Sequence, residues 1–267
     1  MIVKNNFSLI LGSDPFKVLN KKPFKIFSKE IVEFLSDLSK VCLRNYRNNE
    51  SFKEFIGFFF WVRSANLNKL KKDYKNIDFR YGKGGSLHIA PSNVPANALF
   101  SLAFGLLSGN PTVIRISDSS LENLDAVINE FENLLKKKKF STLKQIISVI
   151  NYEHNNELNE KLSEKASSRL IWGGDNTISL FKKYKVQVDC IDLTFPNKTS
   201  SALIDINALN NISGDNRKRF IENFARDIAT FSQNACSSPF IIYTFSEENI
   251  IDADRILKSF FIEIDNF

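Results

Sequence analysis

The chain has 267 residues, 43% of them apolar, so one or two domains with a sizeable buried core are expected. Lysine and arginine outnumber aspartate and glutamate by 36 to 30, a net charge of +6 that is spread along the chain. With no recognised nucleic-acid motif beside it, this modest basic excess argues against nucleic-acid binding.

The first eighty residues predict mainly helices. Residues 1–27 mix short apolar pieces with Gly, Pro and Lys and are expected to form irregular or edge structure. Ser28 is expected to cap a helix over residues 29–46, because apolar residues recur there at helical spacing. Residues 52–74 predict a second helix with a phenylalanine-rich stripe, for which core or interdomain packing is favoured over contact with a lipid or acyl chain. The apolar run at 55–62 is far shorter than the roughly 20 residues that a membrane span needs.

From residue 81 the pattern alternates between strands and helices. Residues 86–90 predict a short buried strand, residues 95–109 a helix that begins with Pro and ends at Gly, and residues 112–117 a second strand. This βαβ unit implies a parallel sheet. The same alternation then predicts helices at 121–138, 157–166 and 175–184, and strands at 145–150, 169–172 and 186–193.

The strand at 169–172 runs into Gly173 and Gly174, and a helix follows. Glycines at such a turn let backbone N–H groups approach a pyrophosphate at the helix N-terminus, although many β–α turns carry glycine for packing alone. The alternation breaks after residue 193, which places a domain boundary between residues 1–195 and 196–267. The second part predicts strands at 201–206 and 239–245 and helices at 215–231 and 249–263.

Residues 234–239 predict a turn between a helix and a strand, with Cys236 at the turn. A thiol in that place can be exposed, oriented and activated, whereas Cys42 and Cys190 lie on apolar patterns typical of buried structural cysteines. The same buried role is the alternative for Cys236. The chain has no C-x-x-C pair and only two histidines, so no metal site is expected. An odd cysteine count without a signal peptide favours the cytoplasm.

Four segments together resemble the aldehyde dehydrogenase superfamily, and more narrowly the acyl-CoA reductases of the bacterial bioluminescence type. They are H-I-A-P-S-N-V-P at 88–95, residues 109–117, the Gly173-Gly174 turn and S-Q-N-A-C-S-S-P at 232–239. The resemblance covers roughly residues 80 to 260. It implies an α/β fold with a parallel Rossmann-type cofactor domain, followed by the first part of an α/β catalytic domain.

The resemblance also implies catalytic roles for two residues. Cys236 matches the family's nucleophile, and a thiolate is a natural attacker of an acyl thioester. Asn93 matches the oxyanion-hole asparagine, whose side-chain amide would act together with the backbone N–H of Cys236. The alternative for Asn93 is a residue that only caps its loop.

The resemblance implies NADPH as the cofactor. Arg115 stands where aldehyde dehydrogenases usually carry a lysine at the adenine ribose, and a guanidinium can pair with a 2′-phosphate. The alternative for Arg115 is a surface arginine at a strand end. Ser117 would lie beside it, and Gly173 and Gly174 match the phosphate-side turn. Trp172 either borders the cofactor cleft or is simply buried beside the glycines.

Hydrolytic members of the superfamily carry a glutamate base before the cysteine, but residues 165–221 contain no glutamate. The expected activity is therefore NADPH-dependent reduction of a long-chain acyl-CoA or acyl-protein thioester to the aldehyde, through a cysteine acyl-enzyme. Relatives run far beyond the nucleophile, so this chain is expected to be truncated. The second hypothesis is an inactive remnant that at most binds nucleotide or a complementing chain. The full-length protein is expected to form an oligomer and to receive acyl groups from an acyl-activating partner enzyme.

Overall fold

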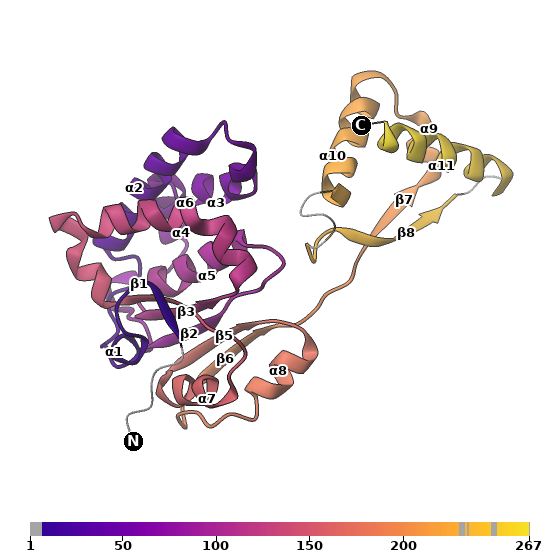
Figure 1. Cartoon of the computed structure of the whole chain (residues 1–267). Coiled ribbons are helices and arrows are strands. Elements are labelled where there is room, and N and C mark those ends of the chain that lie inside the picture. Colours follow the sequence, from indigo (N-terminus) through magenta and orange to yellow (C-terminus); the bar gives the residue numbers. More distant parts are fainter. Residues whose placement is uncertain (1–6, 230–232, 234, 247–249, 267) are drawn as a thin grey trace. The chain divides into compact units, whose positions relative to one another are not determined.

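The structure, a computed structural model, describes residues 7–229, 233, 235–246 and 250–266 (Figure 1). The chain divides into two compact units, Met1–Pro196 and Asn197–Phe267, and each is described by itself. This division differs by one residue from the boundary expected from the sequence. Among the described residues, no helix combines the length and apolar character that crossing a membrane would require.

The first unit is built on a six-stranded sheet with the order β1-β4-β3-β2-β5-β6. All neighbouring strands in it run parallel except the edge strand β1, which pairs antiparallel with β4. The strands are β1 (Ser8–Gly12), β2 (Ser86–Ile89), β3 (Thr112–Ile116), β4 (Ile147–Asn151), β5 (Ser168–Trp172) and β6 (Ile191–Phe195).

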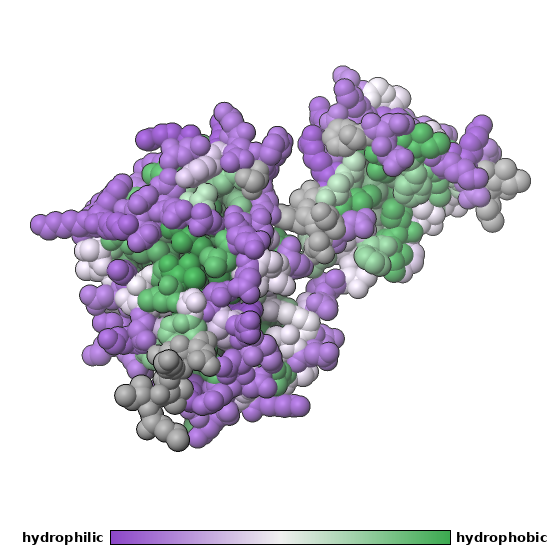
Figure 2. All heavy atoms as spheres, in the orientation of Figure 1, coloured by the Kyte–Doolittle hydropathy of each residue, from purple (hydrophilic) through white to green (hydrophobic). Residues whose placement is uncertain are grey.

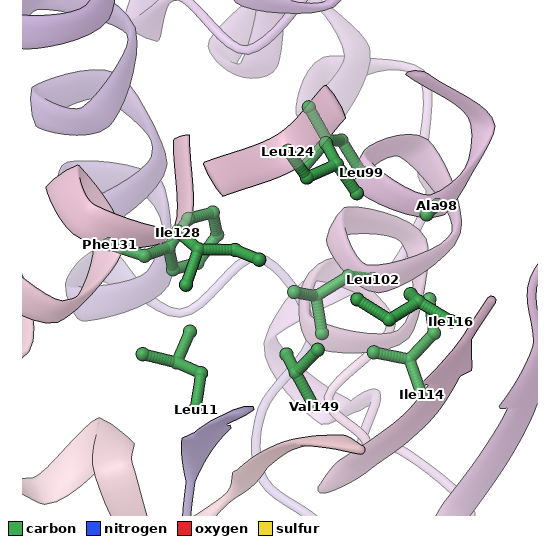
Figure 3. A pocket seen from close by; sticks show the side chains of 10 residues that line it. All are labelled: Leu11, Ala98, Leu99, Leu102, Ile114, Ile116, Leu124, Ile128, Phe131 and Val149. Atoms are coloured by element: carbon green, nitrogen blue, oxygen red, sulfur yellow. The ribbon is translucent and has the colours of Figure 1, made fainter. Parts of the chain in front are cut away.

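Helices cover both faces of this sheet, as buried parallel strands require. They are α1 (Pro15–Leu19), α2 (Lys29–Tyr46), α3 (Ile56–Trp61), α4 (Ser64–Lys72), α5 (Ala96–Leu107), α6 (Asp118–Leu135), α7 (Asn156–Lys165) and α8 (Asp175–Phe181), with 3₁₀ helices η1 (Glu50–Phe55), η2 (Ile77–Phe79) and η3 (Lys138–Gln145). Leu87 and Val113 pack with residues of α1, α7 and α8 in one buried cluster. Ile114 and Val149 point to the other face, toward α5 and α6, where a void of about 20 Å³ has only apolar side chains around it (Figure 3). That void is far too small for a ligand.

The prediction of a single helix over residues 52–74 is wrong. The chain forms η1, α3 and α4 instead, because Val62 closes α3 and Arg63 takes an extended conformation before α4 begins. The break lets the phenylalanine stripe turn inward, where Phe55 and Phe59 are fully buried. Core packing, the interpretation favoured from the sequence, is therefore confirmed for this stripe.

Other details can be compared with the sequence prediction. The edge structure expected within residues 1–27 is confirmed by β1, an edge strand of the sheet, but the short helix α1 was not predicted. Ser28 occupies the N-cap position of α2, but its side chain makes no capping hydrogen bond. The strand predicted at 186–193 begins only at Ile191, because a turn in which the Cys190 N–H bonds to the Gln187 carbonyl precedes it.

The second unit pairs two parallel strands and covers one side of them with helices. Its elements are β7 (Ser200–Asp205), α9 (Ile206–Asn211), α10 (Gly214–Ala229), β8 (Pro239–Phe245) and α11 (Ile250–Asp265). The sequence did not predict α9, which begins where the Asp205 carboxylate accepts hydrogen bonds from two backbone N–H groups. Residues 230–232 and 247–249 lie outside the described residues. They include the end of the helix predicted at 215–231 and the start of the helix predicted at 249–263.

The core of the second unit gathers under the helices, around Ile204, Phe224 and Phe260. The guanidinium of Arg217 on α10 forms a bidentate pair with Glu263 on α11, with Nε to Oε2 at 2.9 Å. Several large apolar side chains of β7 and β8 are nevertheless exposed, among them Leu203 at 71% and Phe240 at 79%. Figure 2 shows hydrophobic residues, in green, over these strands.

Candidate functional site

Three adjacent parallel strands, β3, β2 and β5, bring most of the predicted cofactor residues to one edge of the sheet. From β2 the chain adds β3 and β4 on one side, and it then returns to add β5 and β6 on the other. The loops after β2 and β5 therefore leave the sheet in opposite directions. In open α/β sheets, ligands bind in the crevice at the carboxyl ends of such strands.

Asn93 lies in the loop that follows β2 and precedes α5. Its side chain is exposed, while the next residues, Val94 and Ala96, are buried and hold the loop against the core. The exposed Asn93 is thus carried on a loop with both ends anchored, and it lies at the carboxyl edge of the sheet.

Arg115 is the penultimate residue of β3 and is half-buried. Its Nη2 donates to the Tyr152 carbonyl at 2.9 Å, and the guanidinium carbon lies 5.5 Å from the centre of the Tyr152 ring. Burial raises the pKa of the Tyr152 phenol, and its hydroxyl donates to Asn159 at 2.6 Å. Arg115 is therefore held at the carboxyl edge by a fixed neighbour.

Ser117 is the N-cap of α6, and its Oγ accepts a hydrogen bond from the Ser120 N–H at 3.3 Å. Its hydroxyl also lies 3.1 Å from that of Ser119. Ser117 therefore has a structural role in starting α6, one residue beyond the end of β3.

The end of β5 carries a flat aromatic pair. The Trp172 and Phe195 rings stack with centroids 3.9 Å apart and an interplanar angle of 9°. The Gly173 N–H donates to the Phe195 carbonyl at 3.3 Å, so this amide is already paired inside the first unit. Gly174 is the N-cap of α8, and Asp175 places an acidic side chain in the first turn of that helix. The turn is therefore a weaker binding site for an anion than the sequence pattern indicated.

Sequence reasoning missed a buried polar chain beneath this edge. His88 is completely buried, with Nε2 at 2.8 Å from the Ser86 hydroxyl and Nδ1 at 2.9 Å from the Ser101 hydroxyl. Ser168 donates to Ser86 at 2.9 Å, and Nε1 of Trp172 donates to Ser101 at 3.3 Å. Burial lowers the pKa of His88 from 6.5 to about 3, so its imidazole is neutral near pH 7. A lone histidine within a buried-strand pattern was the available signal.

A second missed feature is the ion pair between Arg169 and Asp192, which are direct neighbours on β5 and β6. Nε of Arg169 lies 2.8 Å from Oδ1 of Asp192, and Nη1 donates to the Phe181 carbonyl at 3.0 Å. The Arg169 side chain is 2% exposed, so β5 joins β6 through a buried charge.

Cys236 lies in the second unit, in the turn before β8, and its thiol is exposed. Its carbonyl accepts a hydrogen bond from the Ser200 hydroxyl at 2.5 Å, which ties the turn to the start of β7. Asn234, beside it in the sequence motif, lies outside the described residues. Cys42 is buried and Cys190 half-buried, and burial raises the pKa of Cys42 to about 12 and also raises that of Cys190.

Because the two units are described separately, the structure brings the predicted residues of the first unit to one sheet edge but does not relate Cys236 to them. Arg115 hydrogen-bonds only through Nη2 within the described chain, and the loops diverge at the strand-order reversal. Among the described residues, no cluster of His, Cys, Asp or Glu could hold a metal ion.

Comparison with known families and curated proteins gives consistent matches. The family described as acyl-CoA reductase (LuxC) matches residues 17–256. The long-chain acyl-protein thioester reductase of Vibrio harveyi is 27% identical over 61% of this chain and 32% of that protein. The long-chain acyl-protein thioester reductase 2 of Photobacterium leiognathi is 25% identical over 66% of this chain and 35% of that protein. The aligned part thus spans about a third of the length of these relatives.

Solved structures show the same fold. The chain is similar to a Mycobacterium tuberculosis aldehyde dehydrogenase complexed with NAD⁺, with a TM-score of 0.65 and 11% identity over 95% of this chain and 53% of that one. A salicylaldehyde dehydrogenase from Pseudomonas putida G7 gives a TM-score of 0.63 and 15% identity over 92% of this chain and 52% of that one. The expected α/β, aldehyde-dehydrogenase-like fold is confirmed, and the chain matches about half of each structure.

Proposed function

This chain belongs to the acyl-CoA reductase (LuxC) family. From that we propose that it carries two parts of an enzyme that reduces long-chain acyl thioesters to aldehydes. They are the nucleophile and the cofactor edge, by which we mean the carboxyl ends of β2, β3 and β5. The observation that carries this proposal is the extent of the family match. It runs from residue 17 to residue 256 and so includes both Asn93 and Cys236. The exposure of both side chains supports it, because each must reach a substrate.

In the proposed reaction, the Cys236 thiolate attacks the thioester carbonyl carbon and a new C–S bond forms. The side-chain amide of Asn93 donates to the oxyanion of that tetrahedral species. The original C–S bond then breaks, releasing the carrier thiolate and leaving the acyl group on Cys236. Bound NADPH would supply the hydride that reduces this acyl group. Collapse of the second tetrahedral species breaks the bond to Cys236 and releases the aldehyde.

Arg115 is the residue we propose for selecting NADPH. Its anchored guanidinium at the end of β3 offers charge-assisted hydrogen bonds to a 2′-phosphate. Ser117, Trp172, Gly173 and Gly174 would border the same nucleotide, with Gly173 contributing through its lack of a side chain instead of its paired N–H. An added Cβ at Gly173 would lie 3.0 Å from the Thr177 side chain, so the turn has little room for a larger residue.

Acyl transfer can be tested without the reduction step. The protein is incubated with a long-chain acyl-CoA, and the adduct is mapped by peptide mass spectrometry. A thioester adduct at Cys236 is expected, lost in Cys236→Ser and retained in Cys190→Ser. Asn93→Asp keeps the side chain's shape but removes its donor, and should slow acylation by about a hundred- to thousandfold. An acyl adduct found at other residues but not at Cys236 would contradict the proposal.

Cofactor choice is tested by calorimetry with NADPH and NADH. Arg115→Gln should weaken NADPH binding by about ten- to a hundredfold and leave NADH binding nearly unchanged. Arg63→Gln, a change at an arginine stacked over Phe60, is the matched control. Equal affinity of the wild-type protein for both nucleotides would remove the role proposed for Arg115.

The names of the relatives favour acyl-protein thioesters beside acyl-CoA as donors. We propose that an acyl-activating partner enzyme presents the acyl group and that the complete protein is an oligomer. Light scattering of the complete protein, alone and mixed with such an enzyme, tests both points; a monomer that forms no complex would contradict them.

The second candidate function is a chain that binds nucleotide or a complementing chain without catalysis. The exposed apolar side chains of β7 and β8, such as Leu203 and Phe240, favour it, because such a surface calls for a covering partner. Nucleotide binding without any acylation at Cys236, in this chain and in one extended to the length of its relatives, would support this candidate over the enzyme.

A further inference from the structure

A cavity of about 780 Å³ lies in the first unit, and its lining includes none of the residues assigned a catalytic or cofactor role above. It is bounded by α3, α4, the part of α5 from Phe100 onward and two connecting segments around residues 26–27 and 79–81. Asn93 precedes the amino end of α5, whereas the cavity contacts this helix from Phe100 to its carboxyl end at Leu107.

Aromatic residues make up most of the cavity lining, which also presents polar atoms. Trp61 lies between two phenylalanines of α5, with ring centroids 5.3 Å from both Phe100 and Phe104. Phe27 and Tyr74, also in the lining, have ring centroids 5.4 Å apart. The volume is within the range of about 300–1,000 Å³ that is typical of small-molecule sites.

The backbone that forms one wall is held firmly. Phe24 and Phe27 donate backbone hydrogen bonds to the carbonyls of Gly109 and Leu107, each at 2.8 Å. Ile26 donates to the Arg80 carbonyl at 3.2 Å. Phe27 has a φ of 47°, a left-handed conformation that is costly for a bulky residue. Conformations of this kind persist where the surroundings enforce them, and they gather at ligand sites.

One cation is placed to meet a ligand's head group. Arg80 is the charged member of the described lining residues, and its side chain has no hydrogen bond or ion pair within the described chain. The neighbouring Lys25 is already paired with Asp78 at 2.7 Å. The exposed rings of Phe79, 86%, and Tyr81, 64%, flank Arg80 at the rim. A largely aromatic lining with one cationic side chain among the described lining residues is complementary to an amphiphile with an anionic head.

We propose that this cavity binds a single-chain amphiphile with a carboxylate head group, the chemistry of a fatty acid. The alkyl chain lies among Trp61, Phe100 and Phe104, and the carboxylate pairs with Arg80. The lining of this cavity includes neither Cys236 nor a residue predicted to bind the cofactor, and the proposal does not depend on the function proposed for them.

Tryptophan fluorescence gives a direct readout. The chain has two tryptophans, and Trp172→Phe leaves Trp61, in the cavity wall, as the only one. Dodecanoate, titrated below its micelle concentration, should shift the Trp61 emission to shorter wavelength in a saturable way. Each methylene added from octanoate to dodecanoate should tighten binding by up to about fourfold.

Two rim variants locate the ligand. Arg80→Gln should weaken dodecanoate binding by about tenfold or more and leave dodecanol unaffected, because only the carboxylate uses the guanidinium. Arg63→Gln, an exposed arginine outside the lining, is the matched control and should bind dodecanoate as the parent does. Phe104→Glu places a negative charge where the alkyl chain is proposed to lie and should abolish dodecanoate binding, with the fold checked by circular dichroism.

The proposal is overturned by any of three results. One is dodecanoate binding that is equal in the parent and in Arg80→Gln. Another is naphthoate binding as tightly as dodecanoate, which would make this a site for planar aromatic acids. The third is a dimer, seen by light scattering, that Phe104→Glu dissociates and dodecanoate does not affect. Retention of dodecanoate binding in Cys236→Ser is expected, so failure here and failure of the proposed enzyme activity are distinguishable.

Discussion

Nε1 of Trp172, at the carboxyl end of β5, donates a hydrogen bond to the Ser101 hydroxyl across 3.3 Å. The same hydroxyl lies 2.9 Å from Nδ1 of the buried His88. One serine on α5 therefore connects the indole at the end of β5 to the imidazole in the middle of β2. The position of Trp172 depends on a polar chain that runs through the core.

Ser101→Ala should destabilise the protein, because it leaves ring nitrogens of both His88 and Trp172 without their partner. The expected loss is about 1–3 kcal/mol in the free energy of unfolding, measured with denaturant. In a Trp61→Phe background, the Trp172 emission should also change. Ser119→Ala, at an exposed serine, is the control and should stay within about 0.5 kcal/mol. Equal effects of the two substitutions would contradict the role given to Ser101.

His88 should make stability depend on pH below neutrality. Its pKa falls from 6.5 to about 3 on folding, so between these values the unfolded chain binds more protons than the folded one. The stabilisation is full above the unfolded pKa and is lost as pH falls, at roughly 1.4 kcal/mol per pH unit. From pH 7 to 5, wild type should lose roughly 2 kcal/mol more than His88→Asn.

The exposed His154 provides the control for that experiment. His154→Asn should keep the wild-type pH dependence between pH 7 and 5. If His88→Asn lost stability with falling pH as steeply as wild type does, the buried neutral imidazole would not be its cause.

Asp192→Asn should cost about 3 kcal/mol of unfolding free energy, because the buried Arg169 loses its counter-charge. This loss lies at the low end of the range expected for breaking a buried ion pair, because the Asp192 side chain is 28% exposed. Asp189→Asn breaks a pair with Lys83 that lies at the surface and should change stability little. Chemical denaturation of both variants decides this, and comparable losses would show that the burial of Arg169 is unimportant.

Cys236 should react with iodoacetamide much faster than the other two cysteines of the native protein. Its thiol is exposed, whereas burial raises the pKa values of Cys42 and Cys190 and so reduces their thiolate populations. Time-resolved peptide mass spectrometry measures the three rates, and Cys236→Ser should remove the fast phase. A fast phase assigned to Cys190 would contradict this order.

The alternation from residue 86 to residue 195 could be predicted because helix and strand periodicities are local. The strands β2, β3 and β5 and the helix α5 fall within a few residues of their predicted bounds. Local patterns failed where packing overrides periodicity. Residues 52–74 break at Val62 and Arg63 so that their phenylalanines can pack against α2 and α5.

The sequence by itself determined the α/β class, the parallel βαβ core and the candidate residues at the ends of the strands, since these follow from spacing along the chain. Only the tertiary structure decided which polar groups meet. It pairs Arg169 with Asp192, holds Arg115 against Tyr152 and encloses the cavity beside Arg80. These contacts join residues that are distant in sequence, and their geometry depends on how strands and helices pack, which no local pattern encodes.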